Sequence, residues 1–172
     1  MAFHKLLPIL AACATLLGAI LIQPRDVRAS DPATLLTIRM ATASGSEVVA
    51  RLALADLDEL AQHSFKTSTI WTEGEAVYAG PLLRDILEKA GVDASLGFRA
   101  IAANGYFVEF PPGAAGTDAP IIATRIDGQT FGVRQKGPLW VIYPYDSDRR
   151  FATETIYARS IWQLTEIEFR GR

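Results

Sequence analysis

Aromatic and polar side chains that could hold a flat ligand gather mainly in the second half of the chain. The set consists of Trp71, Asn104, Tyr106, Lys136, Trp140, Tyr143, Asp146, Arg159, Ser160 and Trp162. Its rings stand near amide, carboxylate and cationic groups, a combination that suits a planar heteroaromatic ring with polar edges. The alternative interpretation is that the three tryptophans belong to the core of a small domain.

Strand alternation around Trp140 bears on this choice. It places Trp140 and Ile142 on one face of a strand and Val141 and Tyr143 on the other. In a sheet with one buried face, Trp140 and Tyr143 therefore cannot both be core residues.

Residue patterns for several catalytic chemistries are absent from the sequence. It contains no Gly-rich phosphate loop, no Gly-x-Ser-x-Gly turn and no His-Glu-x-x-His motif. Beyond the N-terminal segment the only histidine is His63, and no serine is marked as its partner in a catalytic triad. The carboxylates Glu166 and Glu168 alternate on the last expected strand, which indicates a solvated face.

Strands dominate the elements that must position these residues. Apolar and β-branched runs predict strands over residues 35–40, 47–54, 65–71, 76–78, 98–102, 106–110, 121–126, 139–143 and 164–169. The clearest helix is expected over residues 81–90, with Pro81 in its first turn and Gly91 as its terminator. Shorter helices are expected over residues 55–63 and 156–163. The fold class is thus α+β and strand-dominated.

Composition limits the remaining function classes. The chain has 172 residues, 49% hydrophobic and 21% charged, which is typical of one globular domain. Its net charge of -2 provides no basic surplus to neutralise phosphates, so nucleic acid is not expected as a partner.

The first 29 residues are typical of a secretory signal peptide. Lys5 precedes an apolar run over residues 6–22, and Val27-Arg28-Ala29 offers small residues before a cleavage site at Ser30. The alternatives are a membrane anchor, for which the run is short and contains Pro8, and lipidation at Cys13. The segment has no Arg-Arg pair, so a Sec-type route to the periplasm is expected, with any ligand bound outside the cytoplasm. Residues 30–172 would then form a single domain without cysteine and with a net charge of -4.

Short motifs in a fixed order give the chain a family resemblance over residues 65–170. They are Trp71-Thr72-Glu73-Gly74, Tyr78-Ala79-Gly80-Pro81-Leu82-Leu83-Arg84-Asp85-Ile86-Leu87, Asn104-Gly105-Tyr106, Asp127-Gly128, Lys136-Gly137-Pro138-Leu139-Trp140, Tyr143-Pro144 and Ser160-Ile161-Trp162-Gln163-Leu164. This pattern is similar to the molybdopterin-binding domain of the sulfite oxidase family. The resemblance implies the mixed α+β fold of that domain, with a pterin bound across loops that include the last two motifs.

The chain departs from the family's enzymes at the position of the metal ligand. Those enzymes bind molybdenum through a cysteine in the segment that corresponds to residues 63–75, which holds no cysteine here. Where they often have Gly-x-Pro-x-Arg, this chain has Gly137-Pro138-Leu139-Trp140. The shortened form resembles periplasmic pterin-binding proteins that regulate membrane-bound diguanylate cyclase–phosphodiesterases, which implies a free pterin ligand, no molybdenum and no catalysis.

Three functions remain open from the sequence: a pterin-binding regulator, a molybdopterin-dependent oxidoreductase or its subunit, and an interaction module without a ligand. For the first, we expect the pterin to lie against Trp140 or Trp162, with Tyr143 or Tyr106 nearby and Trp71 in the same cluster. Asp146, or failing that Asn104, would bind the 2-amino and N3 edge. The remaining polar side chains, Lys136, Arg159 and Ser160, would bind the 4-oxo group or side-chain hydroxyls.

Overall fold

The structure, a computed structural model, describes residue 1 and residues 33–170. The expected signal peptide and its cleavage site lie outside the described residues, apart from Met1. Residues 33–170 lie within one compact unit.

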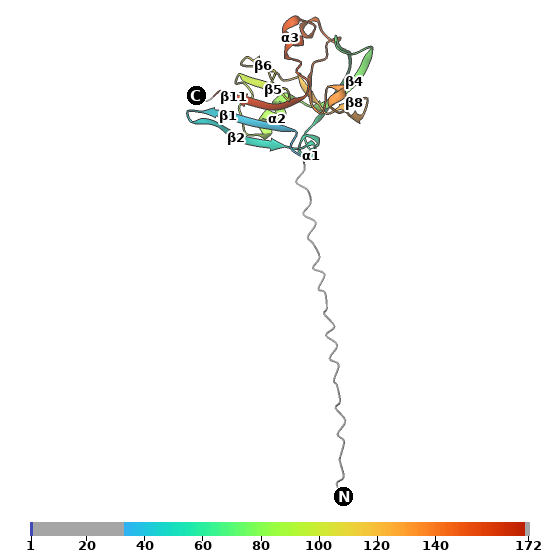
Figure 1. The fold of residues 1–172 in the computed structure, drawn as a ribbon. Helices are drawn as coiled ribbons and strands as arrows, with labels where there is room; N and C mark the ends of the chain where they lie inside the picture. Colours follow the sequence, from blue (N-terminus) through green and yellow to red (C-terminus); the bar gives the residue numbers. More distant parts are fainter. Residues whose placement is uncertain (2–32, 171–172) are drawn as a thin grey trace. The chain divides into compact units, whose positions relative to one another are not determined.

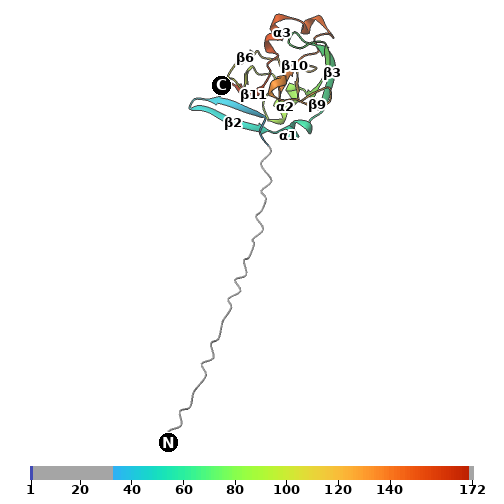
Figure 2. The same ribbon diagram turned by 45° about the vertical axis from the view of Figure 1, so that its right-hand side comes forward.

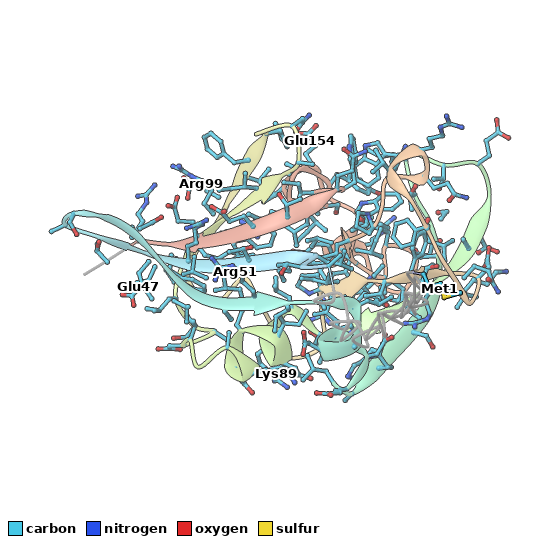
Figure 3. All side chains as sticks on the ribbon, turned by 60° about the horizontal axis from the view of Figure 1, so that its bottom comes forward. Met1, Glu47, Arg51, Lys89, Arg99 and Glu154 are labelled. Carbon is cyan, nitrogen blue, oxygen red and sulfur yellow. The ribbon has the colours of Figure 1, made fainter. Side chains whose placement is uncertain are left out.

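A five-stranded sheet organises one side of the domain (Figure 1). Its order is β2 (Gly45–Leu52), β1 (Leu36–Thr42), β11 (Leu164–Phe169), β5 (Phe98–Ala102) and β6 (Phe107–Phe110). Only the β1–β11 pair is parallel. Figure 3 shows this order across the sheet, with Glu47 and Arg51 on β2 near one edge and Arg99 on β5 near the other.

Alternation along these strands separates an apolar face from a charged one. Leu36, Ile38, Phe98, Ile167 and Phe169 are buried on the inner face. The other face carries ion pairs between neighbouring strands, such as Arg39–Glu166 at 2.8 Å and Arg99–Glu109 at 3.0 Å. Glu166 and Glu168 thus lie on a partly exposed face, as their spacing predicts.

Two smaller sheets complete the strand framework. A four-stranded sheet has the order β3 (Gln62–Ser68), β4 (Glu75–Pro81), β8 (Arg125–Ile126) and β9 (Gln129–Thr130). Strands β7 (Ile121–Ala123) and β10 (Trp140–Ile142) pair with each other. The expected single strand over residues 121–126 is therefore divided between two sheets.

Strand β10 lies in the interior of the domain and is buried on both faces (Figure 2). Trp140 is fully buried and Tyr143 is 3% exposed, so both are core residues. The expectation that they could not both be core does not apply here. It assumed a sheet with one buried face, whereas β10 and β7 are covered on both sides.

The helices are short. They are α1 (Leu54–Asp58), α2 (Leu83–Lys89) and α3 (Glu154–Arg159), with 3-10 turns η1 (Val133–Gln135) and η2 (Arg149–Phe151). Helix α2 begins two residues later than expected, because Pro81 ends β4 and Leu82 stays extended in a bridge to Ile121. Gly91 follows α2 with a φ of 73°, the left-handed conformation expected of its terminator.

The strand-dominated α+β fold is therefore as expected from the sequence. Among the described residues, none of the helices has the length and apolar character needed to cross a membrane.

Candidate functional site

Trp71 lies at the centre of an aromatic cluster that joins three parts of the chain. It belongs to the loop between β3 and β4, residues 69–74. Its ring centroid lies 5.7 Å from that of Trp162, 5.9 Å from Trp140, 5.8 Å from Tyr157 and 6.3 Å from Tyr145, all edge to face. Edge-to-face contacts of this kind stabilise a packed cluster beyond its burial alone. The loop is thereby held against α3 and the residues that follow it.

Hydrogen bonds fix the start of the Trp71 loop. The Asp146 carboxylate accepts bonds from the Ser68 amide and from Ser68 Oγ, the latter at 2.9 Å. The Asp146 amide donates to Thr67 Oγ1 at 3.2 Å. The bonds from Ser68 hold the pKa of the Asp146 carboxyl below its usual value. Asp146 therefore connects the end of β3 to the turn after β10.

Ser160 connects the same cluster to α3. Its carbonyl accepts the Trp140 indole N–H at 3.1 Å, and its Oγ accepts the Tyr145 hydroxyl at 2.6 Å. Ser160 Oγ in turn donates to the Ile156 carbonyl at 2.9 Å. Ser160 is only 2% exposed, and its buried hydroxyl thus has hydrogen-bond partners. The same residue fixes the positions of the Trp140 and Tyr145 rings.

An open pocket with a volume of about 510 Å³ lies beside this cluster. Its walls come from the β3–β4 loop, the turn between β5 and β6, and the segment from α3 to β11. The lining residues are Ile70, Trp71, Ala102, Asn104, Tyr106, Tyr157, Ala158, Ser160, Ile161 and Trp162. Four aromatic rings and no charged side chain are among them, so the pocket suits a flat ligand with an uncharged ring.

Five of the residues expected to bind a ligand line this pocket: Trp71, Asn104, Tyr106, Ser160 and Trp162. Asn104 Oδ1 accepts the Tyr106 amide at 3.0 Å, which leaves its side-chain N–H groups as free donors among the described contacts. Tyr106 is 56% and Trp162 is 37% exposed, so both rings are accessible.

The other five expected residues lie elsewhere. Trp140 and Tyr143 are buried in the core, and the Asp146 carboxylate points to Ser68 rather than to the pocket. Lys136 Nζ lies 5.4 Å from the centroid of the Trp162 ring without lining the pocket, and Arg159 is half-buried at the end of α3. Sequence reasoning missed Tyr157, although an aromatic residue two positions before Arg159 was a usable signal.

Burial changes the chemistry of two tyrosines beneath the pocket. It raises the pKa of Tyr143 and of Tyr145 well above the usual value, so both phenols stay protonated. The Tyr143 hydroxyl has no hydrogen-bond partner among the described residues, and Arg159 acts electrostatically to lower its pKa. Neither phenol can act as a base near neutral pH.

The side chains of residues 33–170 do not fit the molybdenum that the family resemblance implies. This range holds no cysteine, and no group of three or more His, Cys, Asp or Glu side chains within it could hold a metal ion. The pocket lining itself offers no thiolate, imidazole or carboxylate. The aromatic walls do fit a planar organic ring.

Comparison with known proteins bears on the fold. No protein-family model matches the chain, and no curated protein does. Among solved structures, the chain is similar to the sulfane dehydrogenase SoxCD from Paracoccus pantotrophus, with a TM-score of 0.55 and 15% sequence identity. The match covers 80% of this chain and 38% of that one, so this chain spans well under half of its length. At this identity the likeness shows a shared fold and supports the expected sulfite oxidase-type architecture.

Proposed function

We propose that this chain is a periplasmic pterin-binding protein without catalytic activity, which regulates a membrane-bound diguanylate cyclase–phosphodiesterase. The observation that supports it best is the pocket of about 510 Å³ with Trp71, Tyr157 and Trp162 in its walls. A pterin is planar, so its faces can stack on such rings. Base–aromatic stacking contributes about 1–3 kcal/mol and supplies a reference for this contact.

Asn104 is the candidate for recognition of the pterin edge. Its free side-chain N–H groups can donate to the 4-oxo group, and backbone groups of the pocket segments can supply the complementary contacts. Asp146 does not take this role, because both of its carboxylate oxygens accept hydrogen bonds from Ser68. Recognition therefore rests on neutral hydrogen bonds, with stacking as the main source of affinity.

A molybdopterin-dependent oxidoreductase is the second candidate, favoured only by the fold shared with SoxCD. The described residues lack the donor set for the metal, which makes a metal-free pterin ligand the better fit. The third candidate, an interaction module without a ligand, does not explain an open pocket with four aromatic rings in its wall.

The proposal is tested by calorimetry of the mature protein with a tetrahydropterin and with its oxidised form. Trp162→Ala should weaken binding by about 1–3 kcal/mol, which is roughly fivefold to more than a hundredfold in Kd. Val77→Ala is the matched control, since Val77 is also exposed and apolar but lies on β4, outside the pocket lining. Absence of binding to the wild-type protein would overturn the proposal, as would sustained oxidation of sulfite by the purified chain.

Localisation is tested separately by the intact mass of the exported protein. Cleavage between Ala29 and Ser30 gives a soluble product that begins at Ser30. A mass that retains residues 6–22, or a lipid attached to Cys13, would instead place the protein on the membrane.

A further inference from the structure

Lys136 is a half-buried cation that contacts tryptophan rings and no carboxylate. Its Nζ lies 5.4 Å from the ring centroid of Trp162 and 6.0 Å from that of Trp140. Within residues 33–170, every ion pair is made by other side chains. An ammonium group is strongly hydrated, so its partial burial needs a compensating attraction, and the negative face of an indole supplies one.

The backbone on either side of this contact has an unusual conformation. Lys136 has a φ of 72°, and Gln163, which directly follows Trp162, has a φ of 52°. Both values lie in the left-handed region, which is unfavourable for residues other than glycine. Among the described non-glycine residues, only Asp127 shares this conformation, in an Asp-Gly turn. Strain of this kind persists where the surrounding structure enforces it, and it is concentrated at functional sites.

Hydrogen bonds hold the two strained residues against each other. The Gln163 amide donates to the Lys136 carbonyl at 3.0 Å, and Gln163 Nε2 donates to the Val133 carbonyl at 3.0 Å. The Lys136 amide donates to the same Val133 carbonyl at 3.2 Å. The chain is thus fixed beside both members of the contact between Lys136 and Trp162, which reduces the cost of ordering them when a ligand binds.

Trp162 connects this contact to the pocket. Its ring is 37% exposed and lines the pocket, whereas Lys136 is not part of the lining. Lys136 therefore acts on a ligand through the ring on which that ligand stacks. A cation close to an indole attracts its π electrons and so makes the ring less electron-rich. A ring polarised in this way stacks better on an electron-rich partner and worse on an electron-poor one.

We propose that Lys136 is a specificity-determining residue of the pocket, which acts through Trp162 and shifts the preference towards electron-rich pterins. This role rests on the proposed function, which supplies a pterin as the ligand. The nitrogens of the reduced ring of a tetrahydropterin donate electrons into its pyrimidine ring, whereas the oxidised ring system is electron-poor. Both forms have the same 2-amino-4-oxo edge, so hydrogen bonds to that edge do not distinguish them, and stacking on Trp162 does.

The test is anaerobic calorimetry of the mature protein with tetrahydrobiopterin and with biopterin, its fully oxidised form, which has the same side chain. Lys136→Met removes the charge but keeps a long apolar side chain. It should weaken binding of the reduced form relative to the oxidised form, so that the ratio of Kd for biopterin to Kd for tetrahydrobiopterin falls by about threefold. Lys136→Arg retains the cation and should keep the wild-type ratio.

Two controls separate this role from a general effect of charge or stability. Arg134→Met removes an exposed cation of η1 that lies over no aromatic ring within residues 33–170, and it should leave the ratio unchanged. In a Trp162→Ala background, Lys136→Met should no longer change the ratio, because the ring through which it acts is missing. A residue that only stabilised the fold would weaken binding of both pterins by the same factor.

The results distinguish failure of this role from failure of the proposed function. Absence of binding of either pterin to the wild-type protein would overturn the proposed function and this role with it. If the wild-type protein binds a pterin, an unchanged ratio in Lys136→Met would overturn the role of Lys136 alone, as would the same change in the Trp162→Ala background. Thermal unfolding checks the fold of each variant, and Lys136→Gln provides the same comparison if Lys136→Met is unfolded at the assay temperature.

Discussion

Trp140 and Trp162 show how burial separates two residues that the sequence treats alike. Trp140 is fully buried and donates to the Ser160 carbonyl, whereas Trp162 is 37% exposed in the pocket wall. Trp140→Ala should therefore lower the free energy of unfolding by about 3–5 kcal/mol, the range for a large buried aromatic residue. Trp162→Ala should lower it by only about 1 kcal/mol, because the space it leaves opens to solvent. Urea unfolding of both variants measures the difference, and equal losses would mean that Trp162 is also a core residue.

Asp146 gives a prediction with a defined pH dependence. Its folded-state pKa lies below the usual value of 3.8, so its bonds to Ser68 stabilise the fold above that value and are lost as the pH falls through the lowered pKa. Asp146→Asn should cost about 1 kcal/mol near pH 7, since the site is exposed and screened. Thermal unfolding should show a gap between variant and wild type that is constant well above pH 3.8, narrows as the pH approaches 3.8 and closes as the pH falls through the lowered pKa. A gap that does not narrow at all as the pH falls from 7 through 3.8 and below would assign the loss to packing instead of charge.

At the scale of elements, alternation predicts strands well and their partners poorly. Phe98–Ala102 and Leu164–Phe169 have the expected bounds because each alternates between an apolar and a charged face. The prediction of one continuous strand over residues 121–126 is wrong. Pairing with β10 stops before Thr124, and pairing with β4 begins at Arg125. That exchange depends on which backbone lies alongside, and no local pattern contains this information.

Gly80 marks the place where β4 approaches β7 most closely. A methyl group at Gly80 would collide with the Ile122 carbonyl, so Gly80→Ala forces these strands apart and disturbs β10 beyond them. We expect a loss of about 3 kcal/mol in the free energy of unfolding. Gly132→Ala is the control, because nothing lies within 4 Å of its Cβ position and its φ of -96° suits any residue. Its effect should stay within about 0.5 kcal/mol. Similar losses in the two variants would contradict the close approach.

At the scale of the whole molecule, the sequence predicts only part of the pocket wall. Trp71 and Trp162 were recognisable as aromatic residues near polar groups, and both line the pocket. Asp146 and Trp140 carry the same signal, yet one caps the Trp71 loop and the other fills the core. The distinction depends on how the β3–β4 loop packs against α3, a long-range contact that residue spacing does not encode.

Because the pocket joins that loop, the β5–β6 turn and α3, a bound pterin should stabilise the domain as one unit. A tetrahydropterin at about 100 times its Kd adds about 2.7 kcal/mol to the free energy of unfolding. In a domain of this size that corresponds to a rise in Tm of roughly 8–10 °C. In Trp162→Ala, a Kd about tenfold weaker reduces the gain at the same concentration to about 1.4 kcal/mol, so the shift should be roughly halved. Differential scanning fluorimetry measures both shifts, with molybdate alone as a control expected to give none. Equal shifts in the wild-type and Trp162→Ala proteins would place the ligand outside the pocket, since stacking on Trp162 would then contribute nothing to its affinity.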